Sequence, residues 1–387
     1  MSVTRPVGFR AAGVAAGIKE GGARDVALVV ADEPAAVAAM FTVNRAAAAP
    51  VTISRAHVAA GPTGRAVVVN SGCANAGTGE RGLAAAEAMA AAVADAVGCE
   101  PTDVVVCSTG PIGTYLPEDR IAEGIRSAAA VLGDDEASGV AAAEAIMTTD
   151  TVPKTTVVVG DGFVVGGMAK GAGMVRPDMA TMLAVLTTDA VVDPEVLDEA
   201  LRTAVDRSFH ALDIDGCAST NDTVAVLASG GSGIRPDPVE FIGALTAACV
   251  HLEEQLAADA EGASRVVVIE VTGAPDDATA REAGRAMADS ALVRSAFYGG
   301  DPNWGRLLGA LGASPVEFDP TRFSVWFAGV QVAADGEPVA YDETALLEVL
   351  AGGNFDVRVD LGAGTAAVPV ITTDLTPDYV RFNGERS

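Results

Sequence analysis

The sequence has few basic residues, and this shortage excludes several kinds of partner. In a chain of 387 residues, 25 lysines and arginines face 52 aspartates and glutamates, which gives a formal net charge of −27. A field of this sign repels nucleic acid phosphates and anionic membrane surfaces. We therefore expect neither nucleic acid nor a membrane to be a general partner.

Histidine and cysteine are also scarce, and neither shows the spacing that is typical of metal sites. The three histidines are widely separated, and the five cysteines contain no CxxC pair. An odd number of cysteines in a chain of this length also disfavours a disulfide framework. We expect no bound metal and a fold that does not depend on disulfides.

Long hydrophobic runs are absent from the sequence. The sequence contains no uncharged, apolar run of about 18 residues, so no helix is expected to span a membrane. The Ala- and Gly-rich run near the N-terminus is closed by Lys19 and is too weakly apolar for a signal peptide. We expect a soluble, cytoplasmic protein.

Aromatic residues make up only 4% of the chain, although half of all residues are hydrophobic. The core must therefore consist mainly of closely packed small side chains, and the length favours two or three folding units. Some strands are linked as hairpins and others through helices, which favours a layered α/β (α+β) class. We place a domain boundary near residue 262, with an N-terminal domain over 1–262 and a C-terminal α/β domain over 263–387.

Hydrophobic periodicity and turn residues predict the individual elements. We expect strands at 26–30, 66–69, 104–107, 182–186, 223–227, 265–271 and 324–332, with two further strands at the C-terminal end and a hairpin over 155–167. We expect helices at 83–97, 117–132, 137–147, 193–211, 238–257, 278–297 and 343–350.

The most informative stretch covers residues 170–183, KGAGMVRPDMATML. Small residues after Lys170 allow the backbone to approach another group closely, and Pro177 ends any helix. Ala180 and Thr181 then precede an apolar run that is typical of a buried strand.

Threonine is a poor nucleophile unless a base lies next to it. If the chain breaks before Thr181, the α-amino group of Thr181, with an ordinary pKa of about 8, becomes that base. The alternative is that Thr181 is an ordinary β-branched strand residue, and the residue pattern alone favours this alternative.

The stretch resembles the signature of the ornithine acetyltransferase family, the bifunctional glutamate N-acetyltransferases of arginine biosynthesis. Similar strings follow in the family's order over nearly the whole chain. They are STGPIGTYLP (108–117), AIMTTDTVPK (145–154), STNDT (219–223), DAEGASR (259–265) and DPNWGR (301–306).

The resemblance implies an αββα sandwich of the self-cleaving, N-terminal-nucleophile type. Thr181 is expected to attack the carbonyl of Ala180, so that the chain is cut between these two residues. The freed Thr181 is then expected to take an acetyl group from N2-acetylornithine and pass it to glutamate, in a ping-pong reaction without a cofactor. The resemblance leaves open whether acetyl-CoA also serves as acetyl donor, and it suggests a heterotetramer of two α and two β chains.

The resemblance also implies roles for individual residues. Two are expected to form an oxyanion hole, namely Thr109 and Gly110. Four are expected to bind the amino-acid substrates, namely Thr148, Lys170, Thr181 and Glu261. Lysine usage points the same way, because the chain has only three lysines and a compact ammonium group at Lys170 is not interchangeable with a guanidinium group.

The sequence departs from the family pattern at a few positions. Near the C-terminus, Asn383 matches a substrate-binding position, whereas Ser387 matches weakly because the tail is one residue short and lacks a tyrosine. Cys73 and Cys217-Ala218 replace the residues usual in the family and leave the catalytic strings intact. We expect these replacements to alter either the packing or the substrate choice near the site.

Three other functions stay open at this point: a related acyltransferase of secondary metabolism, a self-cleaving aminopeptidase or amidohydrolase, and an inactive binding protein with the same fold. A β-aminopeptidase frees its nucleophile in the same way but lacks the KGxGM, MATML and EGA strings. Acetyl transfer to glutamate, compared with release of free acetate, distinguishes the expected ornithine acetyltransferase from a self-cleaving hydrolase. The presence of every expected catalytic residue argues against the third.

Overall fold

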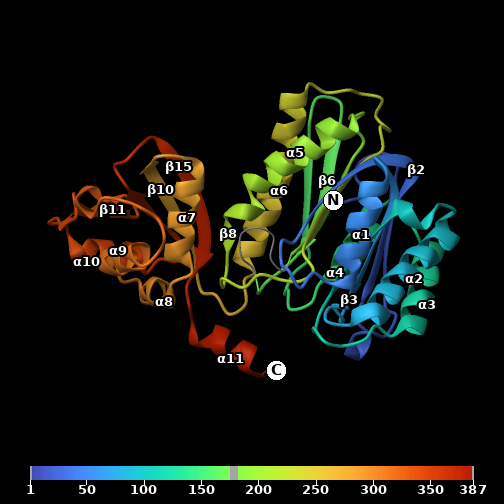
Figure 1. The fold of residues 1–387 in the computed structure, drawn as a ribbon, viewed down its shortest axis with the longest axis horizontal. Helices are drawn as coiled ribbons and strands as arrows, with labels where there is room; N and C mark the ends of the chain where they lie inside the picture. Colours follow the sequence, from blue (N-terminus) through green and yellow to red (C-terminus); the bar gives the residue numbers. More distant parts are fainter. Residues whose placement is uncertain (1, 175–181, 386–387) are drawn as a thin grey trace. The chain divides into compact units, whose positions relative to one another are not determined.

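The computed structural model of the chain describes residues 2–174 and 182–385. These residues fold into two compact units. The first unit contains residues 2–174, 182–210 and 218–256, and the second contains residues 211–217 and 257–385. Figure 1 shows the elements of each unit.

The first unit contains eight strands and six α-helices among its described residues. The strands are β1 (Phe9–Val14), β2 (Val26–Phe41), β3 (Thr63–Ser71), β4 (Val104–Thr109), β5 (Lys154–Val159), β6 (Val164–Lys170), β7 (Leu183–Thr188) and β9 (Thr223–Ala228). The helices are α1 (Ala49–Ala60), α2 (Gly79–Val97), α3 (Glu118–Ala130), α4 (Glu136–Ile146), α5 (Pro194–Asp206) and α6 (Pro238–Ala258).

The eight strands form one hydrogen-bonded sheet in the order β4-β3-β2-β9-β7-β6-β5, and β1 also pairs with β2. Two neighbouring pairs are parallel, β3 with β4 and β7 with β9, and the other pairs are antiparallel. The 16-residue strand β2 joins the two halves of the sheet, because its first part pairs with β1 and β3 and its last part pairs with β9.

Alternate residues of β2 face two different layers. Val26, Leu28 and Val30 belong to a core cluster that includes side chains of α2 and α3. Ala27 and Val29 belong to a second cluster, which includes side chains of α4 and of strands β6, β7 and β9 in the other half of the sheet. A strand with both faces buried requires this continuous apolar run.

The outer helices complete a four-layer arrangement. A Cβ atom placed on Gly167 in β6 would meet Leu186 and Leu252, so α6 covers the face of β6 and β7 that points away from the central cluster. Figure 1 shows α1, α2 and α3 beside β2 and β3, and α5 and α6 on the side of β6. The expected α/β class and its helix–strand–strand–helix order are confirmed, with the refinement that both strand layers belong to one continuous sheet.

The second unit contains a seven-stranded sheet in the order β13-β12-β11-β14-β10-β15-β8. Its strands are β8 (Leu212–Asp213), β10 (Val266–Ala274), β11 (Ser324–Phe327), β12 (Val330–Ala334), β13 (Glu337–Pro338), β14 (Phe355–Asp360) and β15 (Ala366–Thr373). Its helices are α7 (Asp277–Ala288), α8 (Ala291–Gly299), α9 (Trp304–Gly312), α10 (Glu343–Leu350) and α11 (Pro377–Glu385). Short 3-10 turns are η1 (Glu20–Gly22) and η2 (Pro101–Asp103) in the first unit, η4 (Pro320–Arg322) in the second, and η3 (Phe209–Ala211) where the chain passes between them.

Several sequence expectations differ from the structure. The helix expected over 193–211 ends at Asp206, and the separate short turn η3 follows it. The single helix expected over 278–297 is two helices, because Ser290 accepts a hydrogen bond from the Val293 amide and so caps the start of α8. The single strand expected over 324–332 is the β11–β12 hairpin, which turns at Ala328 and Gly329 with positive φ at both residues. Residues 211–217 lie with the second unit, because β8 pairs in parallel with β15.

No helix among the described residues has both the length and the apolar composition needed to cross a membrane.

A buried carboxyl group on α6 should make the stability of the first unit depend on pH. Glu253 is 2% exposed, and burial, with the neighbouring charge of Glu254 adding to it, raises the pKa of Glu253 to about 8. The native state therefore keeps a proton that the unfolded chain loses near its ordinary pKa of about 4.3. Because the native state binds more protons, the free energy of unfolding should fall as the pH rises from about 5 to 8.

We predict that Glu253→Gln removes most of this fall. In urea unfolding at pH 5.5, 6.5 and 7.5, the free energy of unfolding of the variant should rise relative to that of the unaltered protein as the pH rises. The difference should reach roughly a few kcal/mol at pH 7.5. Glu254→Gln is the matched control, because this side chain is exposed, and its slope should change far less. Equal pH slopes for the unaltered protein and Glu253→Gln would contradict the assignment.

Candidate active site

The first part of the site lies at the carboxyl end of β4, where Thr109 is followed by Gly110. Gly110 has a φ of +137°, and a Cβ atom at this position would lie 2.5 Å from the Cys73 nitrogen and 2.6 Å from the carbonyl carbon of Gly72. The Cys73 amide donates to the Thr109 carbonyl at 3.0 Å and so holds the two segments together. Only glycine fits this close approach of two backbone segments.

Two hydrogen-bond donors are available side by side at this turn. Lys170, which is 2% exposed at the end of β6, donates from Nζ to Oγ1 of Thr109 at 3.1 Å. Because this hydroxyl oxygen accepts from an ammonium group, its own proton is available to another acceptor. The Gly110 amide donates to no acceptor among the described residues. This pair has the chemistry required to stabilise a developing oxyanion.

A second group of contacts centres on Asp150, which is buried at the end of the TTD string. Its Oδ1 accepts from Lys154 Nζ at 2.7 Å and from the Gly171 amide at 2.7 Å, and its Oδ2 accepts from the Thr148 amide at 2.9 Å. Both side chains of the Asp150–Lys154 ion pair are fully buried. One carboxylate thus joins the segment of Thr148 to the segment of Lys170.

The charges around Asp150 determine its protonation. Burial alone would raise the pKa of Asp150, but the positive charges of Lys170 and Lys154, together with hydrogen bonds from Lys154 and Gly171, more than offset it, so the pKa is lowered. Asp150 is therefore a carboxylate at neutral pH, and it supplies the negative charge that a buried Lys170 requires.

Lys19 also lies close to this cluster. Its Cγ would lie 3.1 Å from a Cβ atom on Gly72, which is the segment packed against Gly110. Burial lowers the pKa of Lys19, Lys170 acts in the same direction, and Asp25 and Asp150 oppose the effect. All three lysines of the chain therefore gather around one site, in a protein with a net charge of −27.

The STNDT string connects this site to the start of β9. Asn221, which is 6% exposed, donates from Nδ2 to the carbonyl oxygens of Ala74 at 2.6 Å and Ser108 at 2.9 Å. The next residue, Asp222, accepts from the Met182 amide through Oδ1 at 2.9 Å. The residue that precedes Thr109 and the residue that follows Thr181 in the chain are thus both bound by this short segment.

The expected nucleophile and cleavage site, Thr181 and Ala180, lie outside the described residues, as does Ser387. Met182 is the first described residue after them and leads directly into β7.

The second unit contains another pair of expected substrate-binding residues. Asn383, on α11, donates from Nδ2 to Oε2 of Glu261 at 3.1 Å and to the carbonyl of Tyr379 at 3.1 Å. Gly262, which follows Glu261, has a φ of +62°, and a Cβ atom at this position would lie 2.4 Å from the Tyr379 nitrogen of α11. The glycine of the EGA string is thus what lets α11 approach Glu261.

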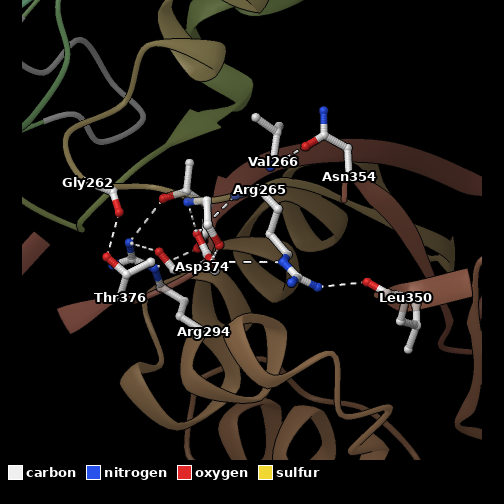
Figure 2. A network of polar contacts seen from close by, with 10 residues as sticks. Gly262, Arg265, Val266, Arg294, Leu350, Asn354, Asp374 and Thr376 are labelled. Carbon is white, nitrogen blue, oxygen red and sulfur yellow. Dashed lines mark hydrogen bonds and ion pairs between the residues drawn. The ribbon is translucent and has the colours of Figure 1, made fainter. Parts of the chain in front are cut away.

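A polar network fixes the segment that carries Glu261, as Figure 2 shows. Asp374, which follows β15 and is 1% exposed, accepts from the amides of Ser264 at 2.9 Å and Arg265 at 3.3 Å and from the Ser264 hydroxyl. Arg294 donates to the carbonyls of Thr373 at 2.9 Å and Asp374 at 3.2 Å.

The far side of this network leads to α11. Thr376 Oγ1 donates to the carbonyl of Gly262, a contact drawn in Figure 2. The same oxygen accepts from the Tyr379 amide at 3.0 Å. The loop before β10 and the start of α11 are therefore tied to each other, which holds Glu261 and Asn383 together.

The structure thus brings the expected site residues together in two groups. Thr109, Gly110, Lys170 and the backbone of Thr148 lie around Asp150 in the first unit, and Glu261 and Asn383 lie together in the second. The described residues contain no group of three or more histidine, cysteine, aspartate or glutamate side chains placed to hold a metal ion.

Sequence reasoning missed Asp150, Asn221 and Asp222 as individual site residues. All three lie in strings that carry the family resemblance. The one local signal was position, since Asn221 and Asp222 directly precede a buried strand.

Comparison with known proteins agrees with the resemblance. Residues 10–387 match the ArgJ family. The arginine biosynthesis bifunctional protein ArgJ of Thermobifida fusca is 50% identical over 388 residues, which is 100% of both chains. The protein of the same name from Mycobacterium leprae is 48% identical over 395 residues, covering 100% of this chain and 95% of that protein.

Solved structures include two similar chains. The ornithine acetyltransferase of Mycobacterium tuberculosis, complexed with ornithine, is 44% identical with a TM-score of 0.42, covering 46% of this chain and 94% of that chain. The ArgJ protein of Bacillus halodurans is 41% identical with a TM-score of 0.43, covering 46% of this chain and 95% of that chain. With a family match over residues 10–387 and curated relatives about half identical over their full length, the chain belongs to the ArgJ family.

Proposed function

We propose that this chain transfers an acetyl group from N2-acetyl-L-ornithine to L-glutamate in arginine biosynthesis, with Thr181 as the nucleophile. The names of the curated relatives place them in arginine biosynthesis and call them bifunctional. The observation that carries the proposal is the hydrogen bond from the buried Lys170 ammonium to the Thr109 hydroxyl, next to the Gly110 amide, which donates to no acceptor among the residues that the structure describes.

Self-cleavage is the first step of the proposed mechanism. The hydroxyl oxygen of Thr181 attacks the carbonyl carbon of Ala180, the C–N bond breaks, and the acyl group moves from nitrogen to oxygen. Water then hydrolyses this ester, which leaves a carboxylate on Ala180 and a free α-amine on Thr181. The amine is the base that the hydroxyl lacked.

Acetyl transfer repeats the same chemistry on a substrate. The Thr181 hydroxyl gives its proton to its α-amine and attacks the acetyl carbonyl of N2-acetylornithine, and the Thr109 hydroxyl and Gly110 amide donate to the oxygen that becomes negative. The amine of ornithine leaves with the proton, and an acetyl ester remains on Thr181. The amine of glutamate then attacks this ester, the C–O bond to Thr181 breaks, and the proton lost by the glutamate amine returns to the Thr181 oxygen as N-acetylglutamate leaves. The reaction is therefore ping-pong and requires no cofactor.

Substrate binding is proposed for the residues that the family resemblance implies. Thr148 and Lys170 in the first unit are proposed to hold the amino-acid substrate, together with Thr181 itself. Glu261 is proposed to pair with the ammonium group of N2-acetylornithine, with Asn383 and Ser387 completing the set. The hydrogen bond from Asn383 to Glu261 and the buried network around Asp374 support this set.

Three further parts of the proposal rest on the family resemblance. Acetyl-CoA is a second candidate acetyl donor for glutamate, in line with the word bifunctional in the relatives' names. The cleaved chains are proposed to assemble as a heterotetramer of two α and two β chains. The enzyme is proposed to act in the cytoplasm, where amino-acid biosynthesis supplies both substrates.

The nucleophile is tested by Thr181→Ala, which should abolish both self-cleavage and acetyl transfer. Intact-mass spectra of the unaltered protein should show fragments of 180 and 207 residues (387 − 180 = 207), and the variant should give one 387-residue chain. Formation of N-acetylglutamate from N2-acetylornithine, measured against release of free acetate, separates the transferase from a self-cleaving hydrolase. Transfer by the Thr181→Ala variant at the unaltered rate would contradict the proposal.

The oxyanion hole is tested by two substitutions at Thr109. Thr109→Val keeps the shape but removes the hydroxyl donor, and kcat should fall about 10²–10³-fold, or ~2.7–4 kcal/mol. Thr109→Ser keeps the donor and should stay within a few-fold of the unaltered enzyme. Equal kcat values for the Val and Ser variants, both folded by circular dichroism, would show that the hydroxyl is not a donor in the reaction.

The substrate role of Glu261 is tested by Glu261→Gln, which removes one charge and keeps the acceptor of Asn383. We expect KM for N2-acetylornithine to rise about tenfold, since about 1.4 kcal/mol of charge interaction is lost. Glu270→Gln is the matched control, because this exposed carboxylate lies on β10 in the same unit, and its KM should be unchanged. An unchanged KM in Glu261→Gln would remove this residue from the binding set.

A further inference from the structure

One buried carboxyl group beside the site has no role in the mechanism above. Asp222 is fully buried and lies immediately before β9, with its own carbonyl accepting from the Thr42 amide at 3.0 Å. It belongs to the STNDT string, in which the preceding Asn221 binds the carbonyl of Ser108.

Asp222 and Thr223 together hold the backbone of Met182. The Met182 amide donates to Oδ1 of Asp222 at 2.9 Å, and the Met182 carbonyl accepts from the Thr223 amide at 3.3 Å. The parallel register of β7 and β9 then begins one residue later, with Leu183 opposite Thr223. Both polar groups of the Met182 main chain are therefore bound by the same two residues.

The two carboxyl oxygens of Asp222 differ in their contacts, because only Oδ1 holds the Met182 amide. Oδ2 is buried and has no hydrogen-bond partner among the described residues. The Thr42 hydroxyl lies close enough to act against the rise in the pKa of Asp222, but its proton is donated to the carbonyl of Ser219 at 2.9 Å. Leaving a buried polar atom unpaired costs about 1–3 kcal/mol, so Asp222 does not hold the Met182 amide without a cost in stability.

Burial also determines the charge of Asp222. It raises the pKa of Asp222 well above its usual range, although the hydrogen bond from Met182 and the positive charge of Lys170 act in the opposite direction. Burial therefore favours the protonated, neutral form of the Asp222 side chain, and asparagine is the nearest isosteric replacement for that form.

We propose that Asp222 is a positioning residue for the nucleophile, which it fixes by holding the amide of the residue that follows Thr181. A peptide unit is planar, so the group that binds the Met182 nitrogen also controls the orientation of the unit that joins residues 181 and 182. This inference rests on the proposed role of Thr181. It assigns to Asp222 the alignment of Thr181 in both self-cleavage and acetyl transfer.

Asp189 provides a matched comparison, because it lies at the end of β7, whereas Asp222 binds the amide of Met182 at the start of β7. It follows β7 directly, is 3% exposed, and accepts from the amides of Val164 at 2.7 Å and Val7 at 3.1 Å, so each of its oxygens has a partner. The two aspartates thus bind backbone amides at the two ends of β7, but only Asp222 does so next to the nucleophile.

The test compares Asp222→Ala, Asp222→Asn and Asp189→Ala. In Asp222→Ala the Met182 amide loses its acceptor, and since a misplacement of about 1 Å can cost about 10²-fold in rate, we expect kcat and the rate of self-cleavage each to fall about 100-fold with little change in KM. Asp222→Asn keeps an oxygen for the Met182 amide and should restore both rates to within about fivefold. Asp189→Ala should lower the urea midpoint and leave kcat within about twofold.

Each outcome decides the proposal. Equal kcat values in Asp222→Ala and Asp189→Ala would overturn it, as would a folded Asp222→Asn variant as slow as Asp222→Ala, because an oxygen that holds the Met182 amide would then not be sufficient. If Asp222→Ala does not fold, Asp222→Glu takes its place. This variant moves the oxygen by one methylene group, and kcat should fall in it but not in Asp222→Asn.

Self-cleavage separates this inference from the proposed substrates. Intact-mass measurement of chains made by cell-free synthesis follows the cut between residues 180 and 181 without any substrate. If the Asp222 variants show the expected order of cleavage rates but no variant, nor the unaltered protein, acetylates glutamate, the positioning role stands and the proposed substrate is wrong.

Discussion

The site depends on one electrostatic constraint, the burial of two ammonium groups around a single carboxylate. Removing a charge from water costs several kcal/mol unless an opposite charge and hydrogen bonds replace the lost solvation. Asp150 supplies the opposite charge for Lys154 and Lys170, and it also accepts hydrogen bonds from the amides of Thr148 and Gly171. Loss of Asp150 would leave two buried cations without their carboxylate, so the conformation of both strings depends on it.

The sheet topology explains how distant strings reach this carboxylate. β3 and β4 run parallel and end together, and β7 and β9 run parallel and start together. The long strand β2 pairs with β3 through its first part and with β9 through its last part, so it carries the chain from one strand layer to the other. Asn221 then joins the end of β4 to the start of β9 through the carbonyl of Ser108. Parallel pairs place chemically distinct residues at a common edge, as in many α/β sites.

Much of this arrangement could be predicted from the sequence, because strands buried on both faces form continuous Val- and Ala-rich runs and helices carry a 3.6-residue period. The errors have local causes. The apolar period continues across Ser290 and hides a helix start, and Ala328 turns the chain where its side chain gives no turn signal. The register that places Leu212 beside Ile371 depends on residues about 160 positions apart in the chain, which no local pattern contains.

The individual site residues divide in the same way. Gly110 and Gly262 carry local information, because each occupies a backbone conformation and a close contact that only glycine tolerates. Asp150 and Asp222 do not, since among 52 acidic residues nothing in the sequence marks the ones that are buried. Their importance arises only when the fold surrounds them with specific donors. Both oxygens of Asp150 accept hydrogen bonds, whereas Oδ2 of Asp222 accepts none among the described residues.

Lysine usage connects these two levels. Elsewhere the chain uses arginine for its positive charges, whereas all three lysines interact with Asp150. Lys154 forms an ion pair with this carboxylate, and the charges of Lys170 and Lys19 interact with it electrostatically. An ammonium group is compact and can donate to a hydroxyl and face a carboxylate within a space that a planar guanidinium group would overfill. Lys170 does both, since it donates to Thr109 and lowers the pKa of Asp150. The composition of the chain therefore already marked the site, although only the fold shows that Lys19 and Lys154 belong to it as well as Lys170.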